Sequence, residues 1–180
     1  MHYRTATPTD IPAIVKLYKA VSKIEGYIAR LEHEVTEDYV SHFLHKSIES
    51  GLIIVGENEE NPEELIAEIH GYTSDLTIFK HVLGDVTFLV HPDHQGKGIG
   101  RTIITIFLDE IANNRPDIGK VELFTGESNR RAIGLYQSLG FMIEGRMELR
   151  YRTPSGTYEA DIPMGWQNPN FEFDGNIPRL

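Results

Sequence analysis

The spacing of apolar residues changes period along this chain, and that change constrains the fold more than any other feature. Residues 9–22 and 36–50 place apolar side chains three and four positions apart, which predicts two amphipathic helices. Residues 52–57 and 65–73 are instead short apolar runs separated by a polar turn, and they predict a β-hairpin. A chain that mixes these two periods builds layers of helices on a sheet.

The rest of the chain continues the mixture. Further strands are expected at 3–7, 85–90 and 121–125, further helices at 100–114 and 128–140, and a final hairpin at 141–166. Thr9 and Thr36 are the expected N-caps of the first two helices, and Gly51 is the expected stop of the second. The predicted order is β α α β β β α β α β β, most simply one α/β (α+β) domain over 1–166. The Pro- and Asn-rich segment 167–180 is expected to be a peripheral tail.

Composition excludes several classes of protein. With 180 residues the chain is long enough for one domain with a sizeable core. The formal net charge of −10 argues against a nucleic-acid-binding surface, and cysteine is absent, which excludes thiolate metal sites and disulfides. No apolar run is long enough to cross a bilayer, and the first residues do not resemble a secretory signal. We therefore expect a cytoplasmic protein with no membrane and no nucleic-acid partner.

The stretch HPDHQGKGIGRT, residues 91–102, lies between a predicted strand and a predicted helix. It combines bare backbone, positive charge and a helix start. The residues concerned are Gly96, Gly98, Gly100, Lys97 and Arg101. Amides at a helix start have no intrahelical partner, and the helix dipole adds partial positive charge there. Glycines allow positive φ and leave space for an anion, so the stretch predicts a phosphate cradle.

The common nucleotide motifs do not match this cradle. A Walker A loop needs serine or threonine after Gly-Lys, but Gly98 follows Lys97. A dinucleotide fingerprint started at Gly96 or Gly98 ends on Arg101 or Ile103 instead of glycine. A nucleotide-binding protein is therefore the weaker interpretation, and a strand-to-helix turn without any ligand is the plain structural alternative.

Two separate motifs resemble those of the GNAT superfamily of acetyl-CoA-dependent N-acetyltransferases. Gln95-x-x-Gly98-x-Gly100 is similar to the family's pyrophosphate loop, with an apolar strand before it and an apolar helix after it. NRRAIGLYQSLGF, residues 129–141, resembles a second family motif and lies at the appropriate distance. The resemblance covers roughly residues 3–166.

This resemblance implies a fold and a cosubstrate. The fold is a mixed, mostly antiparallel sheet with helices on both faces, splayed between the strands 85–90 and 121–125. The pantetheine arm of acetyl-CoA is expected to pair with the backbone of Phe88, Leu89 and Val90. The pyrophosphate is expected on the backbone amides of Gln95, Gly96, Lys97, Gly98, Ile99, Gly100 and Arg101. No metal is implied.

The second motif implies two roles in the site. Asn129 matches the residue that bonds to the pantetheine arm, although it or Ser128 is equally suited to cap the helix. Tyr136 matches the general acid that protonates the leaving CoA thiolate. A tyrosine suits this role because its ordinary pKa of about 10 keeps it protonated at neutral pH. The structural alternative for Tyr136 is a core aromatic.

The acceptor amine must lose a proton before it attacks, and the sequence leaves the general base open. Glu68 and His70 share one face of the predicted strand 65–73 and would form a proton-handling pair if that face borders the cleft. Asp85 begins the strand before the loop, where the family frequently has an acid. The alternatives are a solvated strand face for Glu68 and His70, and a turn residue for Asp85.

The resemblance implies acetyl transfer to a primary amine of a small molecule or protein by direct attack in a ternary complex. The acceptor pocket is expected between residues 23–35 and the final hairpin, where acidic residues suit a cationic amine and arginines suit a carboxylate-bearing one. The acidic net charge favours a cationic amine. A non-catalytic acyl-CoA-binding module is the alternative function. The family also makes a homodimer through the final hairpin a reasonable expectation.

Overall fold

The computed structural model describes residues 1–24, 26–153 and 155–172. The helices are α1 (Ile11–Ser22), α2 (Glu37–Ser50), α3 (Ile99–Asn114) and α4 (Arg130–Ser138). The strands are β1 (Tyr3–Thr5), β2 (Gly51–Glu57), β3 (Leu65–Thr73), β4 (Val82–Val90), β5 (Lys120–Gly126), β6 (Met142–Ile143), β7 (Met147–Arg152) and β8 (Tyr158–Gln167). Short 3-10 turns are η1 (Pro8–Asp10), η2 (Glu32–Glu34), η3 (Thr77–Phe79) and η4 (Pro92–His94).

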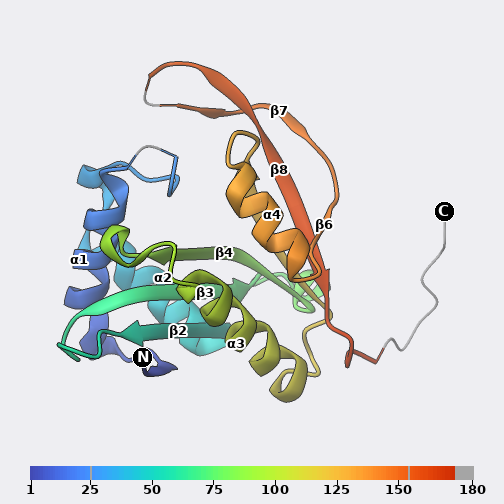
Figure 1. Ribbon diagram of the computed structural model, residues 1–180. Coiled ribbons are helices and arrows are strands. Elements are labelled where there is room, and N and C mark those ends of the chain that lie inside the picture. Colours follow the sequence, from blue (N-terminus) through green and yellow to red (C-terminus); the bar gives the residue numbers. More distant parts are fainter. Residues whose placement is uncertain (25, 154, 173–180) are drawn as a thin grey trace.

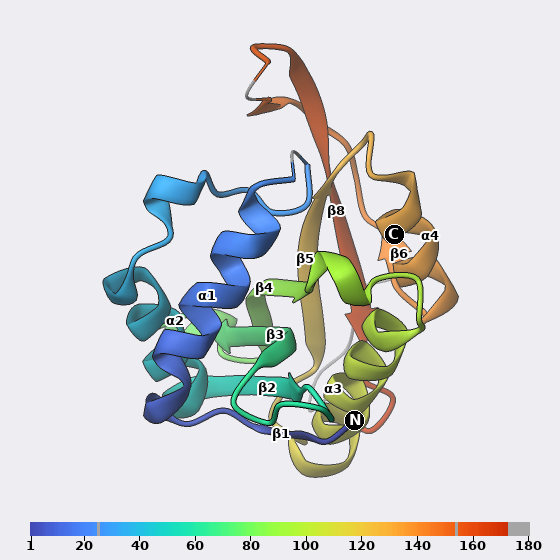
Figure 2. The ribbon, with the colours of Figure 1, turned by 60° about the vertical axis from the view of Figure 1, so that its left-hand side comes forward.

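The strands form one mixed sheet in the order β1-β2-β3-β4-β5-β8-β6, with β7 also paired to β8. Among the described residues its neighbours are antiparallel except for β4 and β5. α1 and α2 cover one face of the β2–β4 half, and α3 covers the opposite face (Figures 1 and 2). The predicted fold class, with helices on both faces of a mostly antiparallel sheet, is confirmed.

The sheet opens between β4 and β5, as the resemblance implied. These two strands pair only where Val82 faces Lys120 and Leu83 faces Val121. Just beyond this junction Asp85 has φ +50°, and the register against β3 shifts at the same place. A bulge of this kind bends a strand and increases its twist. β4 therefore turns away from β5, and its residues 86–90 have no described strand on that side (Figure 2).

Each face of the sheet has its own core. The core on the α3 side contains Ile103, Phe107 and Ile111 of α3, together with Ile133 and Tyr136 of α4. The core on the other side contains the apolar faces of α1 and α2, with residues such as Leu17, Val21, Phe43 and Leu44. α4 thus packs on the α3 side of the sheet, next to the opening between β4 and β5 (Figure 1).

The chain ends of the first two helices follow local side-chain chemistry. Thr36 caps α2 by accepting a hydrogen bond from the amide of Tyr39 at 3.1 Å, and Gly51 ends this helix, both as predicted. The predicted cap Thr9 is wrong, because α1 follows the turn η1. In that turn the carboxylate of Asp10 accepts the amide of Thr7 at 2.7 Å, and Pro8 takes the first position.

The segment predicted as a peripheral tail starts in contact with the domain. The side-chain amide of Asn168 donates to the carbonyl of Ile118 at 2.7 Å, and Asn168 is buried. The ring of Phe171 lies so close to Gly119 that an added Cβ there would be 2.8 Å from it. Residues 173–180 lie outside the described part of the chain. Within that part, no helix has the length and apolar character needed to cross a membrane.

Candidate active site

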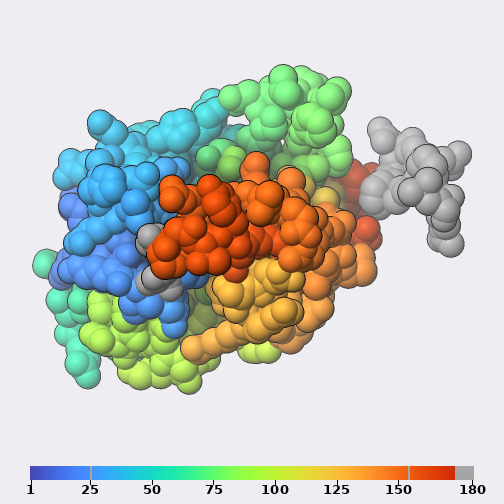
Figure 3. All heavy atoms as spheres, turned by 90° about the horizontal axis from the view of Figure 1, so that it is seen from above, coloured from blue at the N-terminus to red at the C-terminus, as the bar shows by residue number. Residues whose placement is uncertain are grey.

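A cavity of about 470 Å³ occupies the opening between β4 and β5. Its walls come from residues 86–90 of β4, the glycine loop, the end of β5 and the first turns of α4. Residues 26–29 and the hairpin β7–β8 close its other end. Seen from above, this hairpin lies between the N-terminal part of the chain and α4 (Figure 3). The volume is typical of a site for a small organic ligand.

The glycine loop leaves open space at two of its three glycines. Gly96 and Gly98 have φ of +76° and +83°, and a Cβ added at either would meet no atom within 4 Å. Gly98 is also the N-cap of α3, so the first free amides of that helix lie beside this space. Gly100 differs from the prediction. Gly100 lies in the first turn of α3. A larger residue would crowd Phe88, because an added Cβ would lie 3.2 Å from that side chain.

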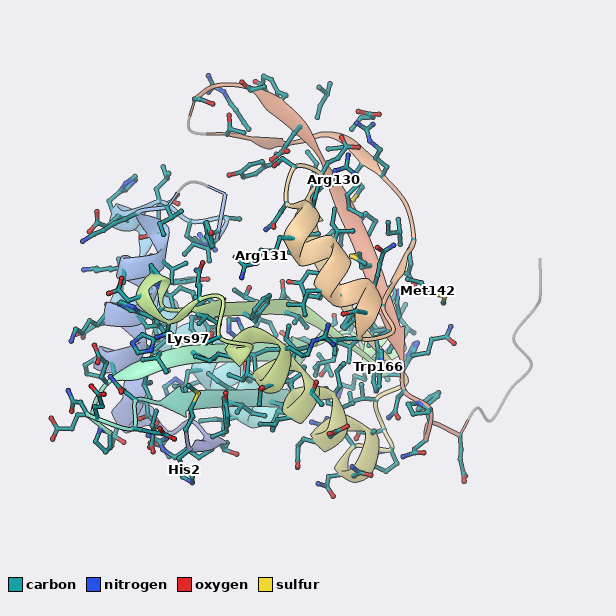
Figure 4. All side chains as sticks on the ribbon, in the orientation of Figure 1. His2, Lys97, Arg130, Arg131, Met142 and Trp166 are labelled. Carbon is teal, nitrogen blue, oxygen red and sulfur yellow. The ribbon has the colours of Figure 1, made fainter. Side chains whose placement is uncertain are left out.

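The polar side chains of the loop have separate tasks. Gln95 holds the turn by donating its side-chain amide to the carbonyl of Val90 at 3.2 Å, as predicted. Arg101 lines the cavity and ties α3 to α4 through a 2.7 Å hydrogen bond to the hydroxyl of Ser138. Lys97 extends from the loop, and Arg131 points from α4 into the space between α4 and the rest of the site (Figure 4). Lys97 does not line the cavity, whereas Arg131 does.

Asn129 lies where the end of β5 passes into α4. Its side-chain oxygen accepts the amide of Ala132 at 3.1 Å, so Asn129 caps this helix. Ser128 is engaged elsewhere, because its amide and hydroxyl both donate to Glu159. The side-chain NH₂ of Asn129 donates to no described residue, and Asn129 lines the cavity. One side chain is therefore able to cap the helix and offer a donor to a ligand.

Tyr136 is buried in the second turn of α4 and lines the cavity. Its ring packs edge to face on Phe88, with centroids 5.8 Å apart, and also contacts Phe141. Its hydroxyl forms no hydrogen bond with a described residue. A buried tyrosine hydroxyl usually has a partner, so this one is available to a group in the cavity. Burial raises the pKa of Tyr136, which keeps the hydroxyl protonated.

The predicted pair of Glu68 and His70 is real, but it lies in the core and not in the cavity. His70 contacts one carboxylate oxygen of Glu68 at 2.9 Å, and the hydroxyl of Tyr18 donates to the other at 2.8 Å. Phe43 stacks on the imidazole with centroids 4.0 Å apart. Glu68 is 0% exposed and His70 is 3% exposed, and neither lines the cavity. The face that they share is sealed by α1 and α2, so the condition for their predicted role is not met.

Asp85 lies at the bulge of β4, next to the lining residue Val86. Its side chain is on the α1–α2 side, beside the hydroxyl of Tyr72. The pKa of Tyr72 rises to about 12, first through burial and then through the negative charge of Asp85. Asp85 itself is exposed and is not one of the residues that line the cavity. It stays a candidate base at the edge of the site.

The closing end of the cavity holds residues that the motifs did not identify individually. They are Tyr27, Ile28 and Ala29 of the loop after α1, Phe124, Thr125 and Gly126 of β5, and Tyr151, Glu159 and Asp161 of the hairpin. The segments expected to form the acceptor pocket contained Tyr27, Tyr151, Glu159 and Asp161, but the sequence did not indicate which of these residues is the most important. The β5 residues follow from the splay, because a strand that loses its neighbour exposes its side chains and backbone. No cluster of metal-binding side chains is found among the described residues.

Comparison with known proteins identifies the class to which this fold and cavity belong. The model of the acetyltransferase (GNAT) family matches residues 16–141, and the chain belongs to this family. An L-amino acid N-acyltransferase of Escherichia coli (strain K12) is 28% identical over 154 residues, which is 82% of this chain and 83% of that protein. A spermidine N(1)-acetyltransferase of Vibrio cholerae is 33% identical over 67 residues, 37% of this chain and 38% of that protein.

Solved structures agree with this assignment. A putative acetyltransferase from Salmonella typhimurium, determined with its cofactor acetyl-CoA, has a TM-score of 0.82 at 22% identity and covers 98% of both chains. A phosphinothricin acetyltransferase from Sinorhizobium meliloti in complex with acetyl-CoA has a TM-score of 0.82 at 16% identity, over 94% of this chain and 89% of that one. These likenesses confirm the fold. With the family match and the relatives, they define the chain as an N-acetyltransferase.

Proposed function

We propose that this enzyme transfers an acetyl group from acetyl-CoA to the primary amine of a small molecule or protein, by direct attack within a ternary complex. The observation that carries the proposal is the hydroxyl of Tyr136, which faces the cavity without a described partner. The amine attacks the thioester carbonyl, and the C–S bond breaks as the amide forms. Tyr136 donates its proton to the leaving sulfur, which lowers the barrier to that step.

The residues present fit acetyl-CoA as the cosubstrate. The open space over Gly96 and Gly98, next to the free amides of α3, suits a pyrophosphate. The side of β4 from Val86 to Val90 that faces β5 has no described strand neighbour, so its backbone groups are available to the amides of pantetheine. The free NH₂ of Asn129 supplies a donor from the other wall.

The acceptor end of the cavity supports a small cationic amine. The carboxylates of Glu159 and Asp161 line this end and attract an ammonium group, while the positive charge of Arg150 lies near Asp161. The relatives named above act on L-amino acids and on spermidine, so both classes belong in a first panel. Both classes enter the reaction as ammonium ions at neutral pH.

The experiment begins with thermal unfolding in the presence of acetyl-CoA, with ATP and NAD as controls. A ligand that binds only the folded state raises the unfolding temperature. We expect a shift with acetyl-CoA alone, followed by amine-dependent release of CoA with a member of the L-amino acid and polyamine panel. A shift with ATP or NAD but not acetyl-CoA would contradict the proposal.

The alternative, an acyl-CoA-binding module without chemistry, makes a different prediction. Acetyl-CoA would still raise the unfolding temperature, but no amine in the panel would accelerate CoA release. Self-association through the final hairpin also stays a prediction. It is supported by exposed apolar side chains there, such as Met147 and Leu149, and sedimentation velocity measures it directly.

A further inference from the structure

The cavity is lined by residues from both faces of the sheet. Val121 and Leu123 of β5 lie in the same core as Tyr136, on the side of α3 and α4. Alternate residues of a strand point to opposite faces, so Phe124 and Gly126 face the other side. No described helix covers that side of β5, where Phe124 is 48% exposed. Both Tyr136 and Phe124 nevertheless line the same cavity.

Asp161 lies on the uncovered face. It is directly opposite Gly126 in the β5–β8 pairing, and directly opposite Met147 in the β7–β8 pairing. Ile162, the next residue, is buried in the core that contains Tyr136, which places Asp161 on the other side of β8. The carboxylate of Asp161 and the hydroxyl of Tyr136 therefore approach one cavity from opposite faces of the sheet.

The two carboxylates at this end of the cavity differ in their partners. Glu159 accepts hydrogen bonds from the amide and the hydroxyl of Ser128, at 3.1 and 3.2 Å, and is held above Gly126. The side chain of Asp161 receives no hydrogen bond from another described side chain. It has the backbone amide of Ile162 and the nearby charge of Arg150. Of these two carboxylates, Asp161 therefore has more oxygen lone pairs available to bind a cationic ligand.

The surroundings of Asp161 favour such a ligand. Partial burial raises its pKa, and the positive charge of Arg150 opposes this rise without cancelling it, while Glu159 adds to it. A partly buried carboxylate whose charge is incompletely balanced gains from a cation placed against it. The acceptor of an acetyltransferase arrives as such a cation, because an alkylamine resembles a lysine side chain and is protonated at neutral pH.

We propose that Asp161 binds the ammonium group of the acceptor and accepts its proton. The assignment rests on the proposed function and names the base that the motifs left open. In this step an N–H bond of the ammonium breaks and an O–H bond forms on Asp161. The neutral amine then attacks the thioester carbonyl from the uncovered face, and the C–S bond breaks as the sulfur takes the proton of Tyr136 on the other face. The second N–H proton, released as the amide forms, restores the hydroxyl of Tyr136. Asp161 releases its proton to solvent after the product departs.

The geometry favours Asp161 over the bases suggested by sequence. Glu68 and His70 are sealed beneath α1 and α2 and do not line the cavity. Asp85 is at the edge of the site, and its side chain lies beside Tyr72. A proton acceptor must come within hydrogen-bond reach of the amine, and among these four residues Asp161 is the one that lines the cavity.

The test compares two small probe nucleophiles in the CoA-release assay at neutral pH, propylamine and hydroxylamine. Propylamine is protonated and needs a base, whereas hydroxylamine is already largely neutral. We expect Asp161→Asn to lower the rate with propylamine by about 100-fold or more, and the rate with hydroxylamine by less than about tenfold. The shift in unfolding temperature caused by acetyl-CoA should be unchanged, because Asp161 is not part of the coenzyme cradle.

The matched control is Glu122→Gln, which removes a carboxylate from the same face of β5 outside the cavity. We expect it to leave both rates unchanged. An active wild-type enzyme whose Asp161→Asn variant keeps its propylamine rate would overturn this assignment and leave the proposed function intact. The same holds if Asp161→Asn lowers both rates equally, or if Asp85→Asn alone shows the selective loss. A wild-type enzyme that is silent with both probes and with every amine of the L-amino acid and polyamine panel would overturn the proposed function and this assignment together.

Discussion

The ring of Tyr136 on α4 meets the ring of Phe88 on β4 edge to face, with centroids 5.8 Å apart and planes at 80°. This contact joins the two walls of the cavity at a place where the strands themselves have separated. Edge-to-face aromatic pairs add stability beyond the burial of their area. The pair therefore holds the walls at a defined spacing and leaves the hydroxyl of Tyr136 directed at the cavity.

Tyr136→Phe removes the hydroxyl and keeps the ring, so it tests the two contributions of this residue separately. We expect turnover to fall by about 100-fold, because the leaving sulfur loses its proton donor, while the packing on Phe88 is kept. The measurements are CoA release and the acetyl-CoA-induced shift in unfolding temperature, which should persist. Because burial raises the pKa of Tyr136, ionisation of this group should cause no loss of rate below about pH 10. Tyr158→Phe, at an exposed tyrosine outside the cavity, is the control. Equal turnover in both variants would return Tyr136 to a structural role.

Gly98→Glu tests the phosphate cradle. The new carboxylate would occupy the open space over the loop and repel a pyrophosphate, so the shift in unfolding temperature with acetyl-CoA should disappear. Gly98→Ala is the matched control. It carries the same strain at φ +83°, about 1–2 kcal/mol, but no charge, and it should keep most of the shift. A folded Gly98→Glu variant with wild-type affinity would rule out the cradle.

Gly134→Ala should stabilise the protein. Gly134 is in the middle of α4, and an added Cβ there would meet no described atom within 4 Å. Alanine is favoured over glycine in a helix by about 1 kcal/mol, which corresponds to roughly 2–4 °C in a chain of this size. Thermal or urea unfolding measures the gain.

Gly100→Ala, in helix α3, should not stabilise the protein as Gly134→Ala does. Its Cβ would lie 3.2 Å from Phe88, so the ring must move and the gain in helix propensity is offset. We expect Gly100→Ala to be neutral or destabilising. If both substitutions stabilised the protein equally, the packing argument for Gly100 would be wrong.

Tyr18→Phe tests the buried cluster around Glu68. The substitution removes the hydroxyl that donates to the Glu68 carboxylate at 2.8 Å and leaves an oxygen with one donor fewer in the core. We expect the free energy of unfolding to fall by about 1–3 kcal/mol in urea titrations. A wild-type stability would mean that the cluster is hydrated or rearranges.

Glu68→Gln tests the catalytic interpretation of the same cluster. Because Glu68 does not line the cavity, its substitution should reduce stability more than it reduces turnover. A 100-fold loss of turnover with unchanged stability would restore the base predicted from the strand pattern.

Asp10→Asn should alter stability in a pH-dependent way. Two nitrogens of Arg4 donate to the carboxylate of Asp10, each at 2.8 Å, and this pairing lowers the pKa of Asp10. A carboxyl whose pKa is lowered by folding stabilises the protein above its unfolded pKa, here 3.8, and loses that contribution as the pH falls below it. We expect the variant to be less stable by about 1–2 kcal/mol at neutral pH, allowing for solvent screening. The difference should shrink toward about pH 3. A difference that does not depend on pH would contradict the role of the ion pair.

Local patterns predicted most of the elements because their causes are local. The helix over 36–50 has its cap, its apolar face and its stop within one segment, and α2 matches it closely. The strand 65–73 coincides with β3. Thr9 was predicted wrongly as a cap because Pro8 and Asp10 first form a separate turn, and choosing between two adjacent polar residues depends on that turn's own hydrogen bonds.

The same distinction between local and tertiary causes applies to the candidate site. The glycine loop and Asn129 could be recognised as candidate site residues from sequence. In each case the strand end, the turn and the helix start are contiguous in the chain. The face on which Glu68 and His70 lie was predictable from strand alternation, but what covers that face was not. Coverage depends on where α1 and α2 dock, and a pair of polar residues on a strand looks the same whether it borders a cleft or a core.

The sequence by itself determined the order of elements up to α4, the location of the glycine loop proposed as the coenzyme cradle and the identity of Tyr136 as the residue to test. The final hairpin expected at 141–166 is instead three strands, β6, β7 and β8. Only the tertiary structure decided that the Glu68–His70 pair is sealed and that Asp161 and Tyr136 line one cavity. The reason is that β8, which carries Asp161, reaches the cavity through non-local pairing with β5, and that a bulge separates β4 from β5 where the cavity lies. Neither event leaves a periodic signal in the residues that it places at the site.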